Sequence, residues 1–282
     1  MPIAVTRAAL SAKTALCGIF LHPAGHTRSP ALHNAAYAAL GIDAVFLAFD
    51  VTSGDLAAAI AGARAMNLRQ LAISIPHKQA VMAHLDRVDE TARAIGAVNT
   101  VVRAGDALVG SNTDWLGIAR ALERETPLAG KTAVVLGAGG TARAALYALR
   151  QRGARAIVLN RTPGKAEALA RELGGARAGA LEELAAIPHD VLINTTSVGL
   201  RSEASPVAAE ALRAGSVVLD AVYDPLDTLL LRDARARGAK PISGKWMLIE
   251  QAREQLRLWT EREVDAAVMA EAFDASSAQP PT

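Results

Sequence analysis

A glycine-rich segment in the middle of the chain constrains the fold more than any other feature. Residues 132–149 read TAVVLGAGGTARAALYAL, an apolar strand, a turn and a helix in direct succession. In the pattern G-x-G-x-x-G/A, the first glycine permits a tight turn, the second lets the backbone approach a pyrophosphate, and the small third residue lets the helix pack on the strand. N–H groups at the helix N-terminus bind phosphates. The segment therefore predicts a Rossmann-type dinucleotide-binding domain, with cofactor contacts at Gly137, Ala138, Gly139, Gly140, Thr141 and Ala142.

The end of the next apolar strand, AIVLN, indicates which cofactor binds. An NAD enzyme usually carries Asp or Glu at this point to bind the ribose 2′-hydroxyl. This chain has Asn160, followed by Arg161 and Thr162, with Lys165 one helical turn later. A 2′-phosphate would form charge-assisted bonds with these cations, whereas an acid would repel it. We therefore expect NADP rather than NAD. We also expect Thr162 to cap the helix that begins at Pro163.

The chain before residue 113 predicts a separate α/β region. Apolar runs predict strands at 14–20, 45–51, 71–75, 97–102 and 107–112, with helices at 31–40 and 56–66 and a short helix opened by Pro76. This alternation is typical of a mostly parallel sheet covered by helices.

After a predicted helix at 114–125 and the breaker PLAGK, a second α/β series follows. It predicts strands at 132–137, 156–160, 191–194 and 217–220, and helices ending at Arg152 and Leu173, starting near Thr228, and running from Trp246 to about Ala272.

Composition excludes several classes of protein. The net charge of +2 over 282 residues is too small for a nucleic-acid binder that relies on charge, and 4% aromatic residues argue against base-stacking platforms. One cysteine, Cys17, excludes a disulfide framework and CxxC metal sites, and we expect it in the core. His22, His26 and His33 lack metal-ligand spacing, so no metal is expected. The sequence has no apolar stretch long enough to predict a signal peptide or a membrane-spanning helix.

Nine short motifs occur in an order that resembles the shikimate dehydrogenase family. They are GHTRSPALHNAAYAALG, SIPHK, GAVNT, SNTD, GAGGTAR, NRT, INTTSVG, YDP and GKWMLIEQA, and they extend from about residue 16 to about residue 259. The resemblance implies reduction of 3-dehydroshikimate to shikimate with NADPH, a step toward chorismate and the aromatic amino acids. It also implies a cytoplasmic enzyme, monomeric or homodimeric, with no nucleic-acid or membrane partner.

The resemblance assigns the acid–base pair to Lys78 of SIPHK and Asp114 of SNTD. Hydride addition to a ring ketone develops negative charge on the oxygen, so a cation and a proton source must lie there. A lysine supplies both, and a carboxylate beside it orients it. Without the resemblance, Lys78 reads as a solvated lysine and Asp114 as a helix cap.

The remaining site residues are also carried over from the family. The substrate carboxylate and hydroxyls are expected to contact Thr27, Ser29, Ser74, Asn99, Tyr223 and Gln251. Ser29 also reads as a helix N-cap before Pro30. The nicotinamide is expected near Asn194, Thr195, Ser197, Val198, Gly244 and Met247.

Because Gln251 would return to the first domain, that domain is expected to be discontinuous. The resemblance implies a substrate domain at 14–113 plus 247–275, a Rossmann domain at 114–246, a cleft between them, and mobile ends at 1–13 and 276–282.

Three departures from the family pattern leave substrate identity open. Ala72 replaces a polar residue, Trp115 stands where Gly is common, and Trp246 follows Lys245 where an apolar residue and Gly are usual. A quinate/shikimate dehydrogenase of broader specificity is one alternative, and a non-catalytic NADP- or ligand-binding regulator is another. A third is a glutamyl-tRNA or folate-type dehydrogenase on the same cofactor domain, but those lack HTRSP and SNTD together.

Overall fold

The computed structural model describes residues 10–25, 27–175 and 177–277. The chain forms two compact units. Unit 1 comprises the described residues of 1–93, 97–113 and 252–282, and unit 2 comprises those of 94–96 and 114–251. His26, which was expected not to bind a metal, lies outside the described residues. The same holds for most of the ends that were expected to be mobile, although helix α9 continues to Ser277.

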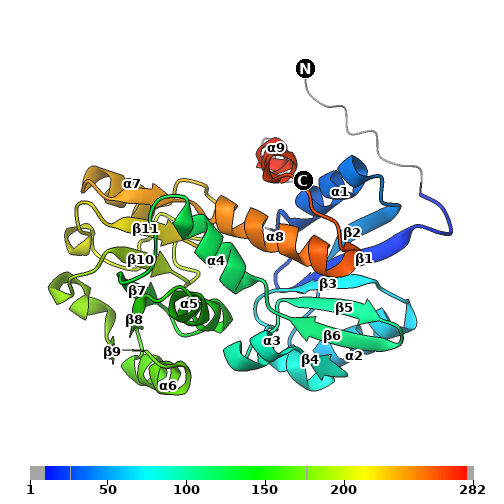
Figure 1. Ribbon diagram of the computed structural model, residues 1–282, viewed down its shortest axis with the longest axis horizontal. Coiled ribbons are helices and arrows are strands. Elements are labelled where there is room, and N and C mark those ends of the chain that lie inside the picture. Colours follow the sequence, from blue (N-terminus) through cyan, green and yellow to red (C-terminus); the bar gives the residue numbers. More distant parts are fainter. Residues whose placement is uncertain (1–9, 26, 176, 278–282) are drawn as a thin grey trace. The chain divides into compact units, whose positions relative to one another are not determined.

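Unit 1 is built on a six-stranded sheet in the order β2-β1-β3-β5-β6-β4 (Figure 1). Strands β1, β2 and β3 run parallel, and β5 pairs antiparallel with both β3 and β6. The strands are β1 Ala15–Leu21, β2 Ala44–Asp50, β3 Gln70–Ile73, β4 Arg87–Val88, β5 Thr100–Ala104 and β6 Ala107–Ser111. The helices are α1 Ser29–Leu40, α2 Leu56–Ala65, the 3₁₀ helix η1 Ala80–His84, α3 Glu90–Ile95 and α9 Ala266–Ser277.

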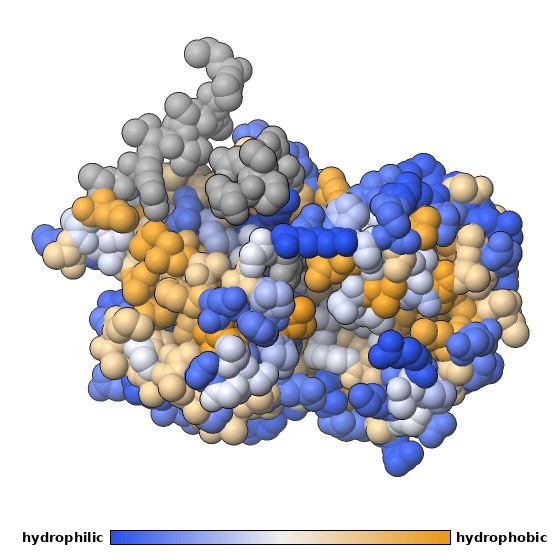
Figure 2. Space-filling view, turned by 180° about the vertical axis from the view of Figure 1, so that it is seen from behind, coloured by the Kyte–Doolittle hydropathy of each residue, from blue (hydrophilic) through white to orange (hydrophobic). Residues whose placement is uncertain are grey.

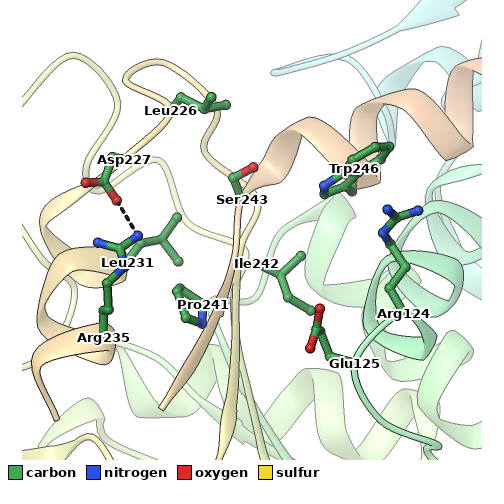
Figure 3. Close-up of a pocket in the computed structure, with 10 residues that line it drawn as sticks. All are labelled: Arg124, Glu125, Leu226, Asp227, Leu231, Arg235, Pro241, Ile242, Ser243 and Trp246. Atoms are coloured by element: carbon green, nitrogen blue, oxygen red, sulfur yellow. Dashed lines mark hydrogen bonds and ion pairs between the residues drawn. The ribbon is translucent and has the colours of Figure 1, made fainter. Parts of the chain in front are cut away.

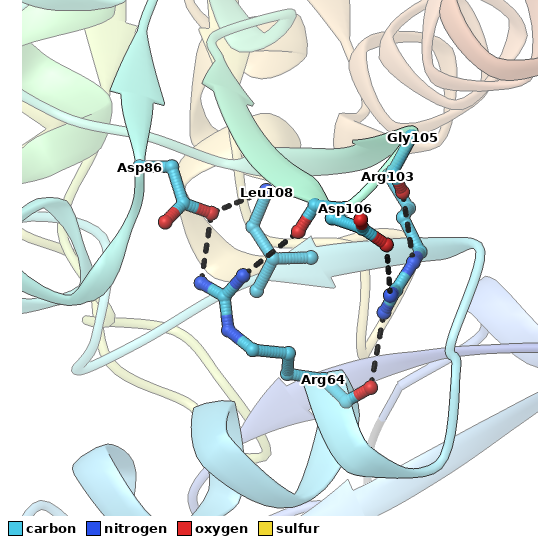
Figure 4. A network of polar contacts seen from close by, with 6 residues as sticks. All are labelled: Arg64, Asp86, Arg103, Gly105, Asp106 and Leu108. Atoms are coloured by element: carbon cyan, nitrogen blue, oxygen red, sulfur yellow. Dashed lines mark hydrogen bonds and ion pairs between the residues drawn. The ribbon is translucent and has the colours of Figure 1, made fainter.

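Apolar packing and one surface network hold unit 1 together. Phe20, Ile60 and Val101 are among the buried side chains that join the sheet to α2. At the end of α2, Arg64 donates to the Asp86 carboxylate (2.8 Å) and to a backbone carbonyl of the β5–β6 turn (2.9 Å), as Figure 4 shows. Arg103 donates to the Arg64 carbonyl at 3.0 Å, so α2 is tied to this hairpin from both sides.

Unit 2 is a fully parallel sheet in the order β12-β11-β10-β7-β8-β9. The first strand along the chain, β7, lies in the middle, which is the doubly wound order of dinucleotide-binding domains. The strands are β7 Thr132–Leu136, β8 Arg155–Leu159, β9 Arg177–Gly179, β10 Val191–Asn194, β11 Val217–Asp220 and β12 Lys240–Ile242. The helices are α4 Asp114–Glu123, α5 Gly140–Gln151, α6 Pro163–Leu173, α7 Leu229–Ala236 and the 3₁₀ helices η2 Leu181–Ala186 and η3 Ala209–Ala211. Helix α8 Gly244–Thr260 begins in unit 2, and its residues from Ala252 onward belong to unit 1.

The sequence-based assignment was wrong at several local features. The continuous helix predicted from Trp246 to Ala272 is two helices, because Glu261 takes a positive φ of 56° and ends α8. After Pro76 the chain forms turns before η1. Strands β4 and β9 and helix α3 were not predicted.

Two predicted helix caps are also corrected. Arg28, not Ser29, is the N-cap of α1, and Ser29 is its first residue. Thr162 is the N-cap of α6, but its side chain makes no capping hydrogen bond.

The surface mixes polar and apolar residues, as the face in Figure 2 shows. The large hydrophobic side chains that are most exposed come from separate segments: Leu10, Leu47, Met66, Ile75 and Leu226. No helix in the described part of the chain is long and apolar enough to cross a membrane.

Candidate active site

One edge of the unit 1 sheet collects the residues predicted to bind substrate within that unit. The carboxyl ends of parallel β1 and β3 meet at the same edge. The antiparallel register places the start of β5 there as well, because Ala72 pairs with Thr100 and Thr100 pairs with Ser111. Ser74 therefore follows β3 and Asn99 precedes β5 at one edge of the sheet. Polar side chains at the carboxyl ends of strands are where open α/β sheets place ligands.

The turn after β3 carries Lys78 and is fixed by backbone hydrogen bonds. The Ser74 N–H donates to the Phe20 carbonyl (2.9 Å), and the His77 N–H donates to the Ser74 carbonyl (2.8 Å). The Val98 N–H donates to the Lys78 carbonyl (2.7 Å). His77 is buried, with Nε2 2.7 Å from the Val51 carbonyl oxygen. The Lys78 side chain is half-buried, and the turn holds its backbone in place.

Asn99 lies in a buried polar network that sequence reasoning missed. Its Oδ1 accepts from the Thr113 N–H (2.7 Å) and from the Thr100 hydroxyl (2.8 Å). Gln255 Nε2 donates to the Asn99 carbonyl and to Thr100 Oγ1, both at 3.1 Å. Gln255 Oε1 is 3.2 Å from His33 Nε2. Gln255 therefore links α8 and α1 to the strand end that carries Asn99. It follows Gln251 by one helical turn, a spacing that puts both on one helix face.

Thr27 and Ser29 lie together at the start of α1. Thr27 Oγ1 donates to Ser29 Oγ at 3.2 Å and accepts from the Ser29 N–H at 3.3 Å. Ser29 is buried and Thr27 half-buried. Two hydroxyls at a helix N-terminus are suited to binding a carboxylate.

The other predicted substrate residues belong to unit 2. Asp114 is the first residue of α4 and is buried, and Tyr223 follows β11 and is half-buried. Gln251 is also buried, and its Nε2 donates to the Leu248 carbonyl at 2.9 Å. The acid–base pair predicted from the sequence thus has one member in each unit, with Lys78 in unit 1.

The strand order reverses between β7 and β10, which is the point at which doubly wound sheets bind a dinucleotide. Gly137 has a φ of +111°, and a Cβ there would come within 2.7 Å of Thr195 Oγ1. Thr195 Oγ1 itself donates to the Leu136 carbonyl at 2.6 Å. The loops after the two strands therefore meet so closely that residue 137 must be glycine.

The glycine loop has room for a pyrophosphate. A Cβ at Gly139 would meet no atom within 4 Å, so the backbone is open on that side. Gly139 is the N-cap of α5 and has no side chain that could cover the start of this helix. Ala142 is fully buried, as close helix packing requires. These residues fit the phosphates of a dinucleotide.

The loop after β8 presents cations and no acid. Asn160 Nδ2 donates to the Thr162 carbonyl at 3.0 Å, which shapes the turn. Arg161, Thr162 and Lys165 are exposed, and within the described residues neither cation pairs with a carboxylate. This donor set fits a 2′-phosphate.

A buried carboxyl group organises the loops after β10 and β11. Asp220 is fully buried and accepts from Asn194 Nδ2 (2.9 Å), the Val222 N–H (3.0 Å) and the Thr228 hydroxyl (2.7 Å). Burial raises the pKa of Asp220 to about 6, and its hydrogen bonds only partly oppose this shift. Asn194 Nδ2 also lies 3.3 Å from the Val198 carbonyl, so the segment that includes Ser197 is held through Asn194. Sequence reasoning treated Asp220 as the end of a strand and missed this role.

Gly244 and Met247 begin α8 next to the loop after β11. A Cβ at Gly244 would lie 2.5 Å from the Ala221 carbonyl oxygen and 2.7 Å from that of Val222. Met247 is buried, and its carbonyl lies against Gly117 of α4. The start of α8 therefore packs directly on the residues that follow β11.

The two unusual tryptophans pack within unit 2. The Arg124 guanidinium lies 3.7 Å from the centroid of the Trp246 ring. Both residues line a cavity of about 370 Å³ beside β12, with Ile242 and Ser243 among its walls (Figure 3). Trp115 packs edge-to-face on Tyr147 of α5, with ring centroids 5.3 Å apart.

Cys17 and His33 are core residues. Burial raises the pKa of the Cys17 thiol to about 11, so the thiol is protonated and a poor nucleophile. Burial lowers the pKa of His33 to about 4, and its ring stacks on Phe46 with centroids 4.1 Å apart. Among the residues described, no three His, Cys, Asp or Glu side chains gather in a way that could hold a metal ion.

Comparison with known proteins identifies the family. The sequence matches the family models described as shikimate dehydrogenase substrate binding domain (residues 19–101), shikimate / quinate 5-dehydrogenase (119–206) and shikimate 5′-dehydrogenase C-terminal domain (244–272). It is 46% identical to the shikimate dehydrogenase (NADP(+)) of Thermococcus kodakarensis, over 92% of this chain and 95% of that one. It is 45% identical to the protein of the same name from Moorella thermoacetica, over 96% and 98%.

Solved structures agree. The shikimate 5-dehydrogenase of Thermus thermophilus in complex with NADP(H) and shikimate is 39% identical, with a TM-score of 0.87 over 93% of this chain and 100% of that one. The ligand-free 5-ketofructose reductase of a Gluconobacter strain is 36% identical, with a TM-score of 0.83 over 94% and 100%. On this similarity over almost the whole length of both sequence and fold, the chain belongs to the shikimate dehydrogenase family.

Proposed function

We propose that this protein is an NADP-dependent oxidoreductase that interconverts 3-dehydroshikimate and shikimate. The observation that carries the proposal is the match of the chain to relatives named shikimate dehydrogenase (NADP(+)), and the motifs SIPHK and SNTD supply an ionisable pair, Lys78 and Asp114, to which we assign the protonation of a ring ketone. A regulator that only binds ligand needs no such pair, which argues against a non-catalytic role. A glutamyl-tRNA or folate-type dehydrogenase is not favoured, because the family models match both halves of the chain.

In this proposal Lys78 and Asp114 manage the charge and the proton at the reacting oxygen. NADPH, when bound, supplies the hydride. As negative charge develops on the ketone oxygen, the Lys78 ammonium stabilises it and donates a proton. The Asp114 carboxylate accepts a hydrogen bond from the hydroxyl that forms at this oxygen, and it orients Lys78. The turn that fixes the Lys78 backbone supports this role, because it limits where the ammonium can reach.

The substrate's polar groups are assigned to the remaining side chains. Thr27 and Ser29 bind the carboxylate at the start of α1, where their hydroxyls already lie within 3.2 Å of each other. The ring hydroxyls are assigned to the hydrogen-bonding side chains of Ser74, Asn99, Tyr223 and Gln251.

The cofactor is assigned to the crevice of unit 2. The loop 137–142 binds the pyrophosphate, and Arg161 and Lys165 bind the 2′-phosphate with Asn160 and Thr162 shaping the turn. The nicotinamide is assigned to the end of β10 and the start of α8: Asn194, Thr195, Ser197, Val198, Gly244 and Met247.

The proposal names shikimate, rather than a related compound such as quinate, as the substrate. Ala72 is buried in β3, two residues before Ser74, so it offers no hydrogen bond near the site. A lost hydrogen bond weakens substrate binding by about 0.5–1.5 kcal/mol. Quinate therefore has to be tested directly. The Gluconobacter relative, named for a different ketone, is a reason to test 5-ketofructose as well.

The test is a grid of initial rates with the purified full-length protein. Shikimate and quinate are each assayed with NADP⁺ and with NAD⁺, and 5-ketofructose is assayed with NADPH. Turnover of shikimate with NADP⁺ that exceeds every other combination by at least about tenfold would support the proposal. Comparable quinate turnover would instead indicate broad specificity, and activity limited to 5-ketofructose would refute the assigned substrate. A Lys78→Ala sample serves as the control for contaminating activity.

The cellular location and the oligomeric state are also part of the proposal. We infer that the enzyme acts in the cytoplasm and is a monomer or a homodimer. Light scattering coupled to size-exclusion chromatography measures the mass directly, and a particle well above 60 kDa would exclude both states.

A further inference from the structure

A buried glutamine of α8, which the proposed function assigns to neither substrate nor cofactor, bonds the start of β5. Gln255 is 1% exposed and belongs to unit 1, as do the groups that its side chain contacts. Its Nε2 donates to the Asn99 carbonyl and to Thr100 Oγ1, both at 3.1 Å. Its Oε1 lies 3.2 Å from His33 Nε2. Both ends of the side-chain amide are therefore used.

The chemistry of these partners fixes the direction of each hydrogen bond. The Asn99 carbonyl oxygen can only accept, so the nitrogen of the Gln255 amide must face it. The amide oxygen then faces His33, whose neutral ring must carry its proton on Nε2. Thr100 Oγ1 accepts from Gln255, and its own hydrogen is donated to Asn99 Oδ1 at 2.8 Å. Hydrogen bonds of one direction thus run from His33 to the side chain of Asn99.

The same network determines which way the Asn99 side-chain amide points. Its Oδ1 accepts from the Thr100 hydroxyl and also from the Thr113 N–H, the latter at 2.7 Å. Turning the amide over would bring Nδ2 against the Thr113 N–H, which can only donate. The bonds at Oδ1 therefore set which atoms of Asn99 a ligand meets at this end of the sheet.

The backbone of Gln255 is held separately from its side chain. Gln70 Nε2 donates to the Gln255 carbonyl at 2.6 Å, and Gln70 is also buried. The strand register pairs Gln70 with Val102, two residues along β5 from Thr100. This bond therefore attaches α8 to the sheet farther from Asn99. The Gln255 side chain is directed instead to the residues at the strand start.

We propose that Gln255 is a positioning residue for substrate binding: through Thr100 and the Asn99 backbone, it fixes the Asn99 side chain for a hydroxyl of the substrate. This inference rests on the proposed function, which assigns Asn99 to the substrate. Gln255 acts only through its neighbours and not at the reacting oxygen, so its loss should weaken substrate binding more than it slows the chemical step. Loss of one neutral hydrogen bond corresponds to about a two- to tenfold change in an equilibrium constant.

The experiment asks whether the effect of Gln255 requires Asn99, with variants of the full-length protein. Gln255→Met keeps an unbranched side chain of similar length but removes both donors. Asn99→Ala removes the group through which Gln255 acts, and a double variant combines the two substitutions. Gln70→Met is the matched control, because it removes a buried hydrogen bond to the backbone of residue 255. For each protein we would measure kcat, the KM values for shikimate and NADP⁺, and the Tm.

We expect Gln255→Met to raise the KM for shikimate about three- to tenfold, with kcat and the KM for NADP⁺ within about twofold of wild type. In the Asn99→Ala background, the same substitution should raise the KM less than about twofold, because coupled residues are not additive. Gln70→Met should lower the Tm and keep both KM values within about twofold. Additive losses in the double variant, or an equal rise of the KM in Gln70→Met, would overturn the inference in favour of a packing role.

Thr100→Val tests the same route if Gln255→Met does not fold. It removes the hydroxyl that donates to Asn99, whereas Thr100→Ser keeps that hydroxyl. A raised KM for shikimate in Thr100→Val, with a KM near that of wild type in Thr100→Ser, would support the proposal. The same KM in both variants would overturn it.

Failure of the proposed function is recognised separately, because the wild-type protein would then not turn over shikimate with NADP⁺. The Thr113 N–H, which donates to Asn99 Oδ1, reports on the Asn99 amide without any turnover. Its hydrogen exchange, measured by NMR, should be faster in Gln255→Met and unchanged in Gln70→Met. Equal exchange in wild type and Gln255→Met would overturn the positioning role on its own.

Discussion

The buried carboxyl group of Asp220 predicts a pH dependence of stability that can be worked out in advance. Three donors surround it, and in the described part of the protein no cation lies within ion-pair distance. Burial disfavours the charged form, so the folded-state pKa is about 6 against an ordinary value of 3.8. Each pKa unit corresponds to about 1.4 kcal/mol, which makes the shift worth about 3 kcal/mol as an upper bound.

The sign follows from proton linkage. Between pH 4 and pH 6 the folded protein binds the Asp220 proton while the unfolded chain releases it, so the free energy of unfolding falls as pH rises. Below about pH 4 both states are protonated, and above about pH 7 both are ionised, with the native state bearing the full cost. Asp220→Asn cannot titrate. Its amide is close in shape to the carboxyl group, and its oxygen can still accept from Asn194 and Val222.

The assay is the Tm of both proteins from pH 4 to pH 7.5. We expect the difference, variant minus wild type, to rise with pH and to level off near pH 7. At roughly 3 °C per kcal/mol for a unit of this size, the rise is at most about 9 °C. At any one pH, the difference in Tm between Asp220→Asn and wild type also reflects the altered hydrogen bond to Thr228. The test therefore depends on how this difference changes with pH.

Asp190→Asn is the matched control. Asp190 is far more exposed, and the Thr132 N–H that it accepts holds its pKa below the usual value. The stability that the ionised Asp190 carboxylate contributes is fully present above its pKa in the unfolded chain. It is lost only as pH falls through the lower pKa of Asp190 in the folded protein. The difference between Asp190→Asn and wild type should therefore be flat from pH 5 to pH 7. A flat profile for Asp220→Asn as well would refute the reasoning, because it would mean that the three donors fully offset the cost of burial.

Three further predictions concern the active site. Lys78→Ala should lower kcat by about 10²–10⁴-fold with a much smaller change in KM and no loss of Tm, and steady-state kinetics showing a comparable kcat would contradict its role. Arg161→Ala should raise the Kd of NADPH about tenfold and leave that of NADH unchanged in fluorescence titrations, whereas equal losses would remove the 2′-phosphate contact. Gly137→Ala should lower both the Tm and NADPH affinity, because its Cβ meets Thr195. Gly139→Ala, whose Cβ meets nothing, should weaken NADPH binding at an unchanged Tm, and identical behaviour of the two variants would count against this reading of the loop.

The strand–turn–helix geometry of the glycine loop was predictable because its determinants are local. A strand, a glycine turn and a helix are adjacent in sequence, and the residue types that permit the turn are few. The positive φ of Gly137 and the full burial of Ala142 are the features that the motif requires. The cations after β8 were predictable for the same reason, since they follow a strand whose end could be read from its apolar run.

Contacts between distant segments were not predictable in the same way. Gln251 and Gln255 share one helix face, but the sequence does not indicate that Gln255 bonds the strand end at Asn99. Arg143 gave only a weak signal: it is a basic residue in an alanine-rich stretch, next to Ala142, Ala144 and Ala145. The partner itself, a carbonyl 48 residues earlier in the chain, follows only from the tertiary fold.

In unit 1, backbone hydrogen bonds position the turn that carries Lys78, whereas side chains form the candidate substrate site. Successive backbone hydrogen bonds from Ile73 to Asn99, from Asn99 to Ser111 and from Val98 to Lys78 continue the pairing on the N-terminal side of Thr100, the first residue of β5. These bonds involve only main-chain groups, so the position of Lys78 does not depend on which side chains occupy residues 72, 74 or 99. Substitutions there can change the substrate while the ionisable group stays in place. This explains how one fold can serve relatives named for shikimate and for 5-ketofructose. Under the proposed function, we therefore expect the alanine at position 72 to affect substrate specificity rather than the chemical step.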